Sequence, residues 1–256
     1  MYLLCERVGV KVLPMFKESI MLKVNQLYHA YEKDHPVLRG VDFEACHGEA
    51  LALLGPNGSG KTTLIKLICD LLEIQKGDVR LNGFENDRYD VKKSILYLPS
   101  DDILPEFLKG REYVKLLMNL FEKEYDENNF LKLSEMYSFT PALNVMIGEY
   151  SNGMKKKIQL ISAFMVDPEV MIIDETLNGM DVESQEITKS LLKKYSNSDN
   201  ILIMCSHDLH LLEEICDKAI MLYQGDIYMQ ASMEKINREN GLLSVFREAV
   251  NEGNPL

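Results

Sequence analysis

The residues best suited to chemistry form one glycine-rich run: Gly55, Pro56, Asn57, Gly58, Ser59, Gly60, Lys61, Thr62 and Thr63. This run matches the pattern G-x-x-x-x-G-K-[ST] at every fixed position. Its glycines let the backbone curl so that N–H groups point inward, where they can hold phosphate groups. Lys61 can reach the outer phosphates, and the hydroxyl of Thr62 can ligate a magnesium ion. The run therefore predicts a site for a nucleoside triphosphate.

The segments on either side of this run have the patterns that such a loop requires. Residues 50–54 are wholly apolar and follow Gly48, which is typical of a buried parallel strand. After Lys61, apolar residues recur at helical spacing, so a helix is expected to begin there and to direct its positive N-terminus at an anion. A glycine-rich turn without a ligand is the alternative, and the order of strand, loop and helix argues against it.

Acidic and imidazole side chains follow two later strands. Residues 170–173 form an apolar run that ends in Asp174 and Glu175, and residues 201–205 form another that leads to His207. Ligands bind at the carboxyl ends of strands in open α/β sheets, so we expect these side chains to meet the glycine-rich run. Asp174 is interpreted as a magnesium ligand, Glu175 as the group that activates a water, and His207 as a hydrogen-bond donor at the γ-phosphate. The alternatives are a helix cap for the acidic pair and a structural hydrogen bond for His207.

The remaining patterns predict an α/β protein: a P-loop NTPase three-layer core with an antiparallel β flank and an inserted helical subdomain. Residues 22–31 and 37–45 alternate apolar and polar side chains, which predicts the flank. Helical spacing at Glu112–Glu124 and Phe130–Tyr137 predicts the inserted subdomain, at about residues 104–166. Further short apolar runs predict the other strands of the core sheet.

Length and composition limit the domain organisation and the partners. The 256 residues are expected to form an N-terminal extension of unassigned role (1–20), a nucleotide-binding domain (21–235) and a C-terminal tail (236–256). A net charge of −12 argues against a nucleic-acid partner, because phosphate binding needs a basic face. The five cysteines show no CxxC spacing, which favours reduced thiols in the cytosol. No apolar run is long enough to span a membrane.

Taken in order, these motifs resemble the nucleotide-binding subunits of ABC transporters over about residues 22–230. The matching positions are the base-stacking aromatic Tyr31, the Walker A loop 55–63, the Walker B segment 170–175 with its catalytic Glu175, the D-loop 178–181 and the switch histidine His207. A tyrosine packed in the core is the alternative for Tyr31.

Residues 150–155 stand where the family's signature L-S-G-G-Q belongs. Ser151 and Gly153 precede a helical apolar pattern, so they are expected at a helix N-terminus, which favours an anion. In the family this N-terminus contacts the γ-phosphate bound by the other subunit, so Ser151 and Gly153 are expected to bind ATP. The basic run 155–157 that follows is interpreted as a solvated helix face.

The resemblance also implies a function and partners. ATP and Mg²⁺ would be the cofactors, and two ATP molecules would be buried between two head-to-tail subunits, as a homodimer or a heterodimer. Hydrolysis would drive substrate movement through a separate polytopic membrane subunit, which would hold this chain at the cytoplasmic face of the membrane. Residues 108–112 look like those of subunits that drive small export pumps, which favours export.

Three departures from the family pattern bear on hydrolysis. Ser100 stands where a magnesium-binding glutamine is usual, and serine is too short to copy glutamine. Either a following aspartate binds the metal or the contact is lost, and Ser100 itself is kept as a candidate metal ligand. Asn152 replaces a signature glycine, and we expect it to keep a left-handed turn, which asparagine tolerates. Thr176 and Leu177 replace the usual Pro-Thr after Glu175. The alternatives to a transport ATPase are therefore a degenerate or regulatory ATP-binding partner in a heterodimer, and a soluble ABC ATPase without a transport role.

Overall fold

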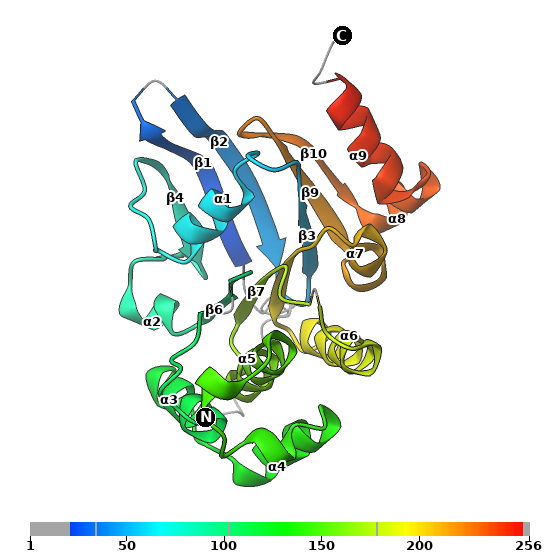
Figure 1. The fold of residues 1–256 in the computed structure, drawn as a ribbon. Coiled ribbons are helices and arrows are strands. Elements are labelled where there is room, and N and C mark those ends of the chain that lie inside the picture. Colours follow the sequence, from blue (N-terminus) through cyan, green and yellow to red (C-terminus); the bar gives the residue numbers. More distant parts are fainter. Residues whose placement is uncertain (1–20, 34, 102, 178, 253–256) are drawn as a thin grey trace, which may run out of the picture.

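The computed structural model describes residues 21–33, 35–101, 103–177 and 179–252 (Figure 1). The expected extension 1–20, Asp102, Asn178 and residues 253–256 lie outside the described residues. Within these ranges the chain forms a 4-stranded sheet and a 6-stranded sheet, with helices packed on both. None of the helices in the described ranges is long and apolar enough to cross a lipid bilayer.

The predicted antiparallel flank is confirmed. Its strands, in spatial order, are β2 (His35–Cys46), β1 (Met21–Glu32), β4 (Lys76–Leu81) and β5 (Phe84–Glu85). Asn82 and Gly83 join β4 to β5 with φ values of 54° and 81°, as an Asn-Gly hairpin requires. One face of this sheet lies over α1 (Lys61–Ile68), the helix that follows the glycine-rich run.

The larger sheet carries the carboxyl ends at which the site is expected. Its strands, in spatial order, are β10 (Asp226–Ser232), β9 (Lys218–Tyr223), β3 (Ala50–Leu54), β8 (Ile201–Cys205), β7 (Val170–Asp174) and β6 (Ile95–Leu98). All neighbours pair in parallel except β9 and β10, which form an antiparallel hairpin at one edge of the sheet. Every residue of β3, β7 and β8 is buried, which explains why these strands read as continuous apolar runs.

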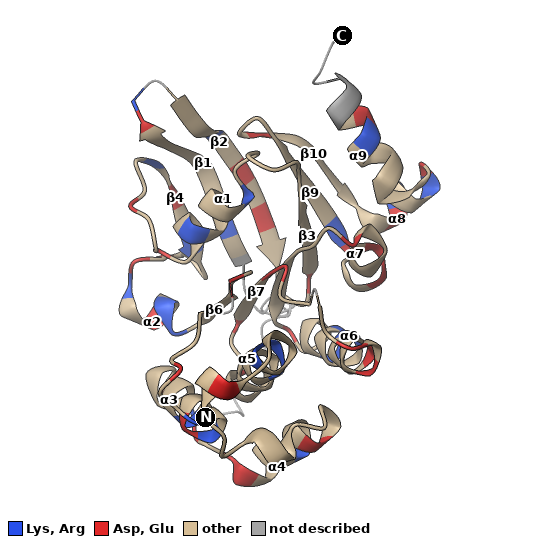
Figure 2. Ribbon diagram, viewed as in Figure 1, with Lys and Arg blue, Asp and Glu red and all other residues tan. Residues whose placement is uncertain are grey.

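Helices between β6 and β7 form the lobe drawn in green in Figure 1. They are α3 (Gly110–Leu120), α4 (Glu127–Met136) and α5 (Asn152–Val166). The prediction of a helix to Glu124 is wrong, because Glu122 has a left-handed φ of 53° that ends the first helix. Acidic and basic residues are interspersed over the helices (Figure 2), and one ion pair joins Lys93 Nζ to Glu122 Oε2 at 2.7 Å.

Five other α-helices complete the described chain. They are α2 (Tyr89–Lys92), α6 (Val182–Ser196), α7 (Leu209–Ile215), α8 (Met233–Arg238) and α9 (Gly241–Glu252), while α1 begins at Lys61 as predicted. The solvent exposure of the cysteines is mixed: Cys205 and Cys216 are buried, and Cys46 is exposed.

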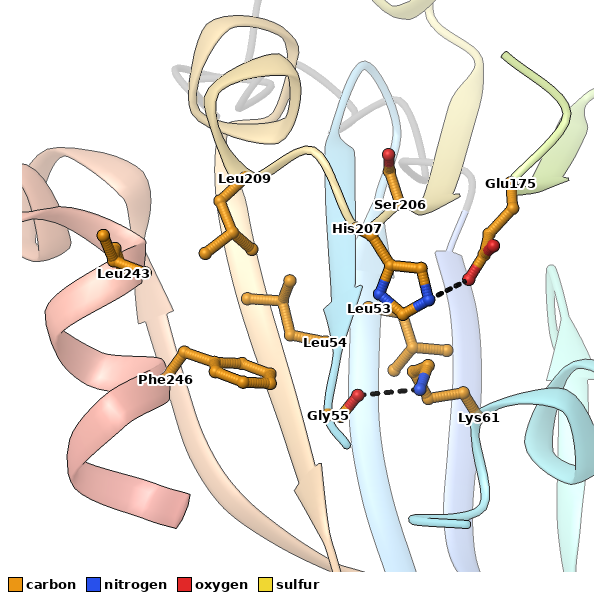
Figure 3. Close-up of a pocket in the computed structure, with 10 residues that line it drawn as sticks. All are labelled: Leu53, Leu54, Gly55, Lys61, Glu175, Ser206, His207, Leu209, Leu243 and Phe246. Carbon is orange, nitrogen blue, oxygen red and sulfur yellow. Dashed lines mark hydrogen bonds and ion pairs between the residues drawn. The ribbon is translucent and has the colours of Figure 1, made fainter. Parts of the chain in front are cut away.

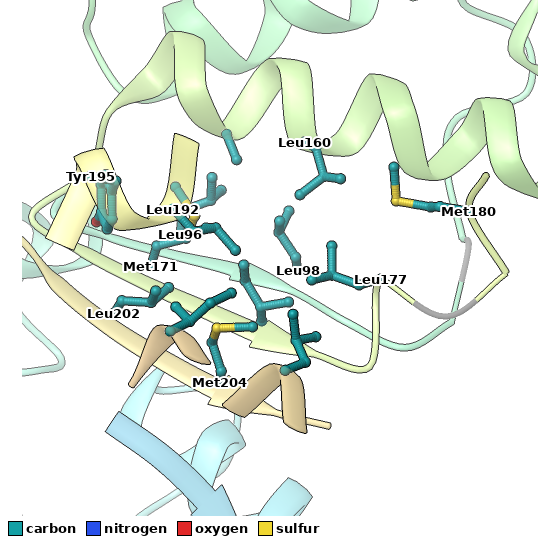
Figure 4. Packing of buried hydrophobic residues seen from close by; sticks show 14 of the residues in the cluster. Leu96, Leu98, Leu160, Met171, Leu177, Met180, Leu192, Tyr195, Leu202 and Met204 are labelled. Carbon is teal, nitrogen blue, oxygen red and sulfur yellow. The ribbon is translucent and has the colours of Figure 1, made fainter. Parts of the chain in front are cut away.

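Alternation along the central strands divides the interior into two apolar clusters. Met171 and Ile173 of β7 point to one face of the sheet, and Val170 and Ile172 point to the other. Figure 4 shows the first face, where strand residues pack against Leu160 of α5 and against α6. The second face packs against α1 and the antiparallel flank, which produces the three layers predicted from the sequence.

Asn86 provides a test of how α1 is held. Its side chain is 4% exposed, and Nδ2 donates to the carbonyl oxygens of Leu67 (2.7 Å) and Ile68 (3.1 Å) at the C-terminal end of α1. Asn86→Ala leaves buried carbonyls unpaired, so we expect urea unfolding to show a loss of about 1–3 kcal/mol in the free energy of unfolding. The exposed Asn128→Ala is the control and should change it by less than about 0.5 kcal/mol. Equal losses in both variants would contradict this role for Asn86.

Candidate functional site

The glycine-rich run forms the loop between β3 and α1, and its glycines are required by its shape. Gly55, Gly58 and Gly60 have φ values of 147°, 80° and 105°, which side-chain-bearing residues rarely adopt. A Cβ atom at Gly60 would lie 2.6 Å from Leu38 Cδ2, and one at Gly55 would lie 2.3 Å from the Leu222 carbonyl oxygen. The loop is therefore packed closely from outside, with its backbone curled around an inner space.

Polar groups inside this loop fit a phosphate chain. Lys61 Nζ folds back over the loop and donates to the carbonyl oxygens of Gly55 (2.7 Å) and Pro56 (3.2 Å). Ser59 Oγ is buried and makes no hydrogen bond within the described residues. No described side chain caps the N-terminus of α1, so its first N–H groups remain available to an anion.

The structure brings most of the predicted ATP and metal residues to one cavity of ≈ 370 Å³. Its lining residues are Val37, Asn57, Gly58, Gly60, Lys61, Thr62, Thr63, Ser100, Asp174 and Glu175. These residues come from the flank, the loop, α1 and the ends of β6 and β7. The carboxyl ends of parallel strands therefore converge here, as expected for an open α/β sheet.

Asp174 is the buried carboxylate of this cavity. It is 5% exposed and accepts a hydrogen bond from Tyr97 Oη at 3.2 Å. Burial raises the pKa of the Asp174 carboxyl, the hydrogen bond from Tyr97 opposes that rise, and the charge of Glu175 adds to it. Burial also raises the pKa of Tyr97, so its hydroxyl stays protonated and donates. Sequence patterns did not identify Tyr97, because they do not indicate which side chain of β6 faces β7.

The donor atoms near Asp174 suit Mg²⁺. Thr62 and Ser100 add hydroxyl oxygens to the same cavity, and Mg²⁺ prefers oxygen ligands and retains water and phosphate oxygens. No group of three or more His, Cys, Asp or Glu side chains that could hold a metal ion occurs among the described residues. This is the donor set expected for a metal held by one carboxylate, hydroxyls and a nucleotide rather than by an all-protein cage.

Glu175 and His207 form a pair across the ends of β7 and β8. His207 Nε2 lies 2.8 Å from Glu175 Oε1 (Figure 3). Glu175 has a left-handed φ of 56°, and its N–H donates to the Cys205 carbonyl oxygen at 2.9 Å. A left-handed φ is uncommon in a residue with a side chain, although turn residues such as Asn82 and Glu122 of this chain share it. The helix-cap alternative for the acidic pair is not observed, because Asp181 caps α6, the next helix described after β7.

Tyr31 lies at the end of β1 beside the loop. Its side chain is 61% exposed, which excludes the core alternative. Tyr31 Oη lies 3.2 Å from Thr63 Oγ1, and the ring of His29 packs edge-on at 5.0 Å between centroids. The ring is thus held next to α1 with one face available to a base. The sequence did not predict the contact of His29 with Tyr31, because a spacing of two residues indicates only that both side chains lie on the same face of a strand.

The signature residues lie apart from this cavity. Ser151 caps α5, and its Oγ accepts from the Met154 N–H at 3.3 Å, as predicted. Neither Ser151 nor Gly153 lines the cavities described at the glycine-rich loop. The expected left-handed turn at Asn152 is wrong: Asn152 is the first residue of α5 and has no positive φ. A helical asparagine needs no glycine-like backbone, so this substitution leaves the N-terminus of α5 intact.

The prediction of a solvated face for residues 155–157 is wrong for two of the lysines. Lys157 Nζ lies 2.8 Å from Asp181 Oδ2, and the Lys157 side chain is 17% exposed. Lys155 Nζ lies 3.3 Å from Glu106 Oε1, and the Lys155 side chain is 15% exposed. The hydrogen bond from Lys157 is the main cause of the lowered pKa of Asp181. These pairs connect the start of α5 to the segment after β6 and to the cap of α6.

The contacts of Tyr31 generate a test of base stacking. We expect Tyr31→Phe to keep the aromatic face and to bind ATP within about threefold of the parent, whereas Tyr31→Ala should weaken ATP binding about tenfold. Inorganic triphosphate has no base, so its affinity should be the same for all three proteins. Titration calorimetry measures both ligands. An equal loss for ATP and inorganic triphosphate in Tyr31→Ala would show that the side chain supports the loop rather than the base.

The sequence and the fold of this chain are both similar to those of known proteins. A sequence model described as ABC transporter matches residues 38–178. The ABC transporter ATP-binding protein YdbJ of Bacillus subtilis (strain 168) is 30% identical over 202 residues, which cover 77% of this chain and 65% of that protein. A solved ATP binding subunit of an ABC transporter is 25% identical, with a TM-score of 0.83 and coverage of 90% of this chain and 100% of that one.

A further solved structure shares the fold. It is a dimer of the ATP-binding cassette MJ0796 in a post-hydrolysis state, bound to ADP and Pi. It is 19% identical to this chain, with a TM-score of 0.75 and coverage of 83% of this chain and 98% of that one. The family match over residues 38–178 and the identity to YdbJ agree with the motifs in the cavity. The chain belongs to the ABC transporter family and is an ATP-binding, ATP-hydrolysing domain of that family.

Proposed function

We propose that this chain powers an ABC transporter: it hydrolyses ATP to move a substrate, in the export direction, through a separate membrane-spanning subunit. The observation that carries the proposal is the convergence of Lys61, Asp174, Glu175 and His207 at one edge of the core sheet. A chain that only binds ATP, without hydrolysing it, would need the glycine-rich loop and Lys61 but neither Glu175 nor His207. A strained glutamate paired with a histidine beside the same loop favours hydrolysis.

In the proposed reaction, the chain positions a water for in-line attack on the γ-phosphorus of ATP. Glu175 accepts the proton of the attacking water, and the bond from the γ-phosphorus to the bridging oxygen of ADP breaks. His207 Nε2 now contacts Glu175 and is well placed to turn its N–H to the γ-phosphate. The positive charge of Lys61 offsets the negative charge that develops on the phosphates as ADP leaves. Thr62, Asp174 and Ser100 would hold Mg²⁺, which would supply further positive charge beside the phosphates.

The proposed active unit is a head-to-tail dimer. Ser151 and Gly153 present the N-terminus of a 15-residue helix, which favours an anion, and they line neither cavity at this chain's own loop. A phosphate held by a second subunit fits that N-terminus. The second subunit is either a copy of this chain or a related ATPase. The solved MJ0796 structure is a dimer of a cassette of this fold, which supports a dimer as the active unit.

The proposed membrane subunit has a docking surface beside the ATP cavity. Ile103 and Phe107 are 83% and 76% exposed, and they follow Ser100, which lines the cavity. Large apolar side chains exposed together often mark a contact with another protein. A membrane subunit bound there would hold the chain at the cytoplasmic face and would sense the state of the nucleotide site.

A regulatory ATP-binding role in a heterodimer is the second candidate, and Ser100 is the observation that favours it. Serine is shorter than glutamine, so it reaches less far toward a metal or a γ-phosphate. The chain would then bind ATP and turn it over slowly, while a paired ATPase supplied most of the hydrolysis.

Turnover by the purified full chain separates these candidates. We expect Glu175→Gln to lower kcat by about 10²–10⁴-fold, because the water loses its proton acceptor, and to keep ATP affinity within about threefold. His207→Ala should also lower kcat. Glu183→Gln, an exposed glutamate at the start of α6, is the matched control and should keep the parental rate. A parent rate no higher than that of Glu175→Gln would favour the regulatory role.

Co-purification tests the docking surface. A tagged chain isolated from its native membranes in mild detergent should bring down a protein with several membrane spans, identified by mass spectrometry. Phe107→Asp should lose that protein and keep ATPase activity, because Phe107 lies outside the cavity. Leu71→Asp, which alters a leucine that is 59% exposed elsewhere, is the control and should retain the partner. Recovery of soluble proteins or ribosomes alone would contradict the transport role.

A further inference from the structure

The C-terminal helix α9 contributes to a cavity that also contains the residues proposed for hydrolysis. This cavity of ≈ 250 Å³ is lined on one side by Leu243 and Phe246 of α9. Lys61, Glu175 and His207 line its other side (Figure 3). Neither the sequence motifs nor the proposed reaction assigns any role to residues 236–256.

Helix α9 is anchored to α7 rather than loosely attached. Leu242 and Ala249 are 0% and 1% exposed, so one face of α9 is buried in the main apolar cluster. The N–H of Leu242 donates to Glu213 Oε1 of α7 at 2.6 Å. Gly241, with a φ of 80°, makes this close approach possible, because a Cβ there would lie 2.7 Å from the same oxygen.

Helix α7 in turn begins at Leu209, two residues after His207. The carboxylate of Asp208 caps α7 by accepting from the N–H of Leu211 at 3.1 Å, and Leu212 is fully buried. His207 is therefore held between the end of β8 and a helix whose position depends on α9. Because α9 packs on α7, a loss of this packing would change the position of the His207 imidazole.

The apolar side of the cavity also changes the surroundings of the catalytic pair. Leu54, Leu209, Leu243 and Phe246 form this side, and Figure 3 shows the Phe246 ring extending from α9 toward Leu54. These apolar side chains exclude water from that side of the cavity. The 2.8 Å contact of His207 with Glu175 lies across the same cavity, so the apolar side limits the space into which the imidazole can turn.

We propose that α9 is a positioning element for ATP hydrolysis: Leu243 and Phe246 form the apolar wall that holds the His207–Glu175 pair in place. The proposal rests on the assignment of that pair to hydrolysis. Helix α9 then affects mainly the rate of turnover, because it does not line the cavity that contains Thr62, Ser100 and Asp174.

The test compares kcat and KM for ATP in the full chain and in point variants of α9. Phe246→Ala should lower kcat about tenfold or more and leave KM within about twofold, since misplaced catalytic groups slow the chemical step without weakening binding. Leu243→Ala, which alters a side chain that is 47% exposed, should act in the same direction at little risk to folding. Phe246→Leu keeps an apolar wall and should retain at least about half of the turnover. Glu248→Ala, on the exposed side of α9, is the control and should match the parent.

Glu175→Gln measured alongside separates this inference from the proposed function. If Glu175→Gln abolishes turnover while Phe246→Ala and Leu243→Ala keep the parental kcat, only the role of α9 is overturned. If Glu175→Gln retains turnover, the assignment of the pair itself is wrong. Phe246→Ala and Phe246→Leu could also both change kcat and KM by equal factors. That result would show that Phe246 has only a structural role, and it would also overturn the proposal.

Discussion

The parallel alignment of β3, β7 and β8 is the constraint on which the rest of the structure depends. In register, Asp174 lies opposite Cys205, so the chain leaves β7 and β8 at the same level. Because β3 pairs with β8 in the same direction, its loop opens at that edge too. Residues separated by more than a hundred positions in the chain therefore share one cavity without any side chain having to reach far. Burial of all three strands by helices and by the flank keeps this alignment rigid.

That rigidity allows the site to hold groups that are unfavourable in isolation. Asp174 is buried with a raised pKa, Glu175 has a left-handed backbone, and Ser59 Oγ is buried without a hydrogen bond in the described residues. The strained backbone of Glu175 and the unpaired hydroxyl of Ser59 each oppose folding by about 1–3 kcal/mol. The surrounding strand ladders and apolar clusters must offset these costs and that of burying Asp174. A bound metal and triphosphate would satisfy the charge of Asp174 and the polar groups of the loop. Ligand binding and local stability are therefore linked at this site.

The sequence predicted those parts of the fold that depend on local patterns. Ala50–Leu54 and Ile201–Cys205 were predicted at their observed bounds, because a continuous apolar run between polar residues indicates a buried strand. Helix α7 was missed because it has only 7 residues, too few for a clear helical period. The contacts of Tyr97 with Asp174 and of Lys157 with Asp181 were also missed. They join distant segments, and the spacing of residues along one segment carries no information about its neighbours.

The departures from the family pattern have unequal physical consequences. Asn152 is an ordinary helical residue, so it changes little. Ser100 is different, because it shortens the side chain that faces the cavity at the start of the segment carrying Phe107. Yet Glu106, in that same segment, has two contacts at the start of α5. Its side chain pairs with Lys155 of α5, and its carbonyl oxygen accepts from the N–H of Gly148, four residues before α5. The segment is thus connected to the signature helix as well as to the cavity. In the proposed complex, a movement of α5 on binding of a second subunit would be transmitted to Phe107 through these contacts, so the proposed coupling would not depend on the side chain at position 100 alone.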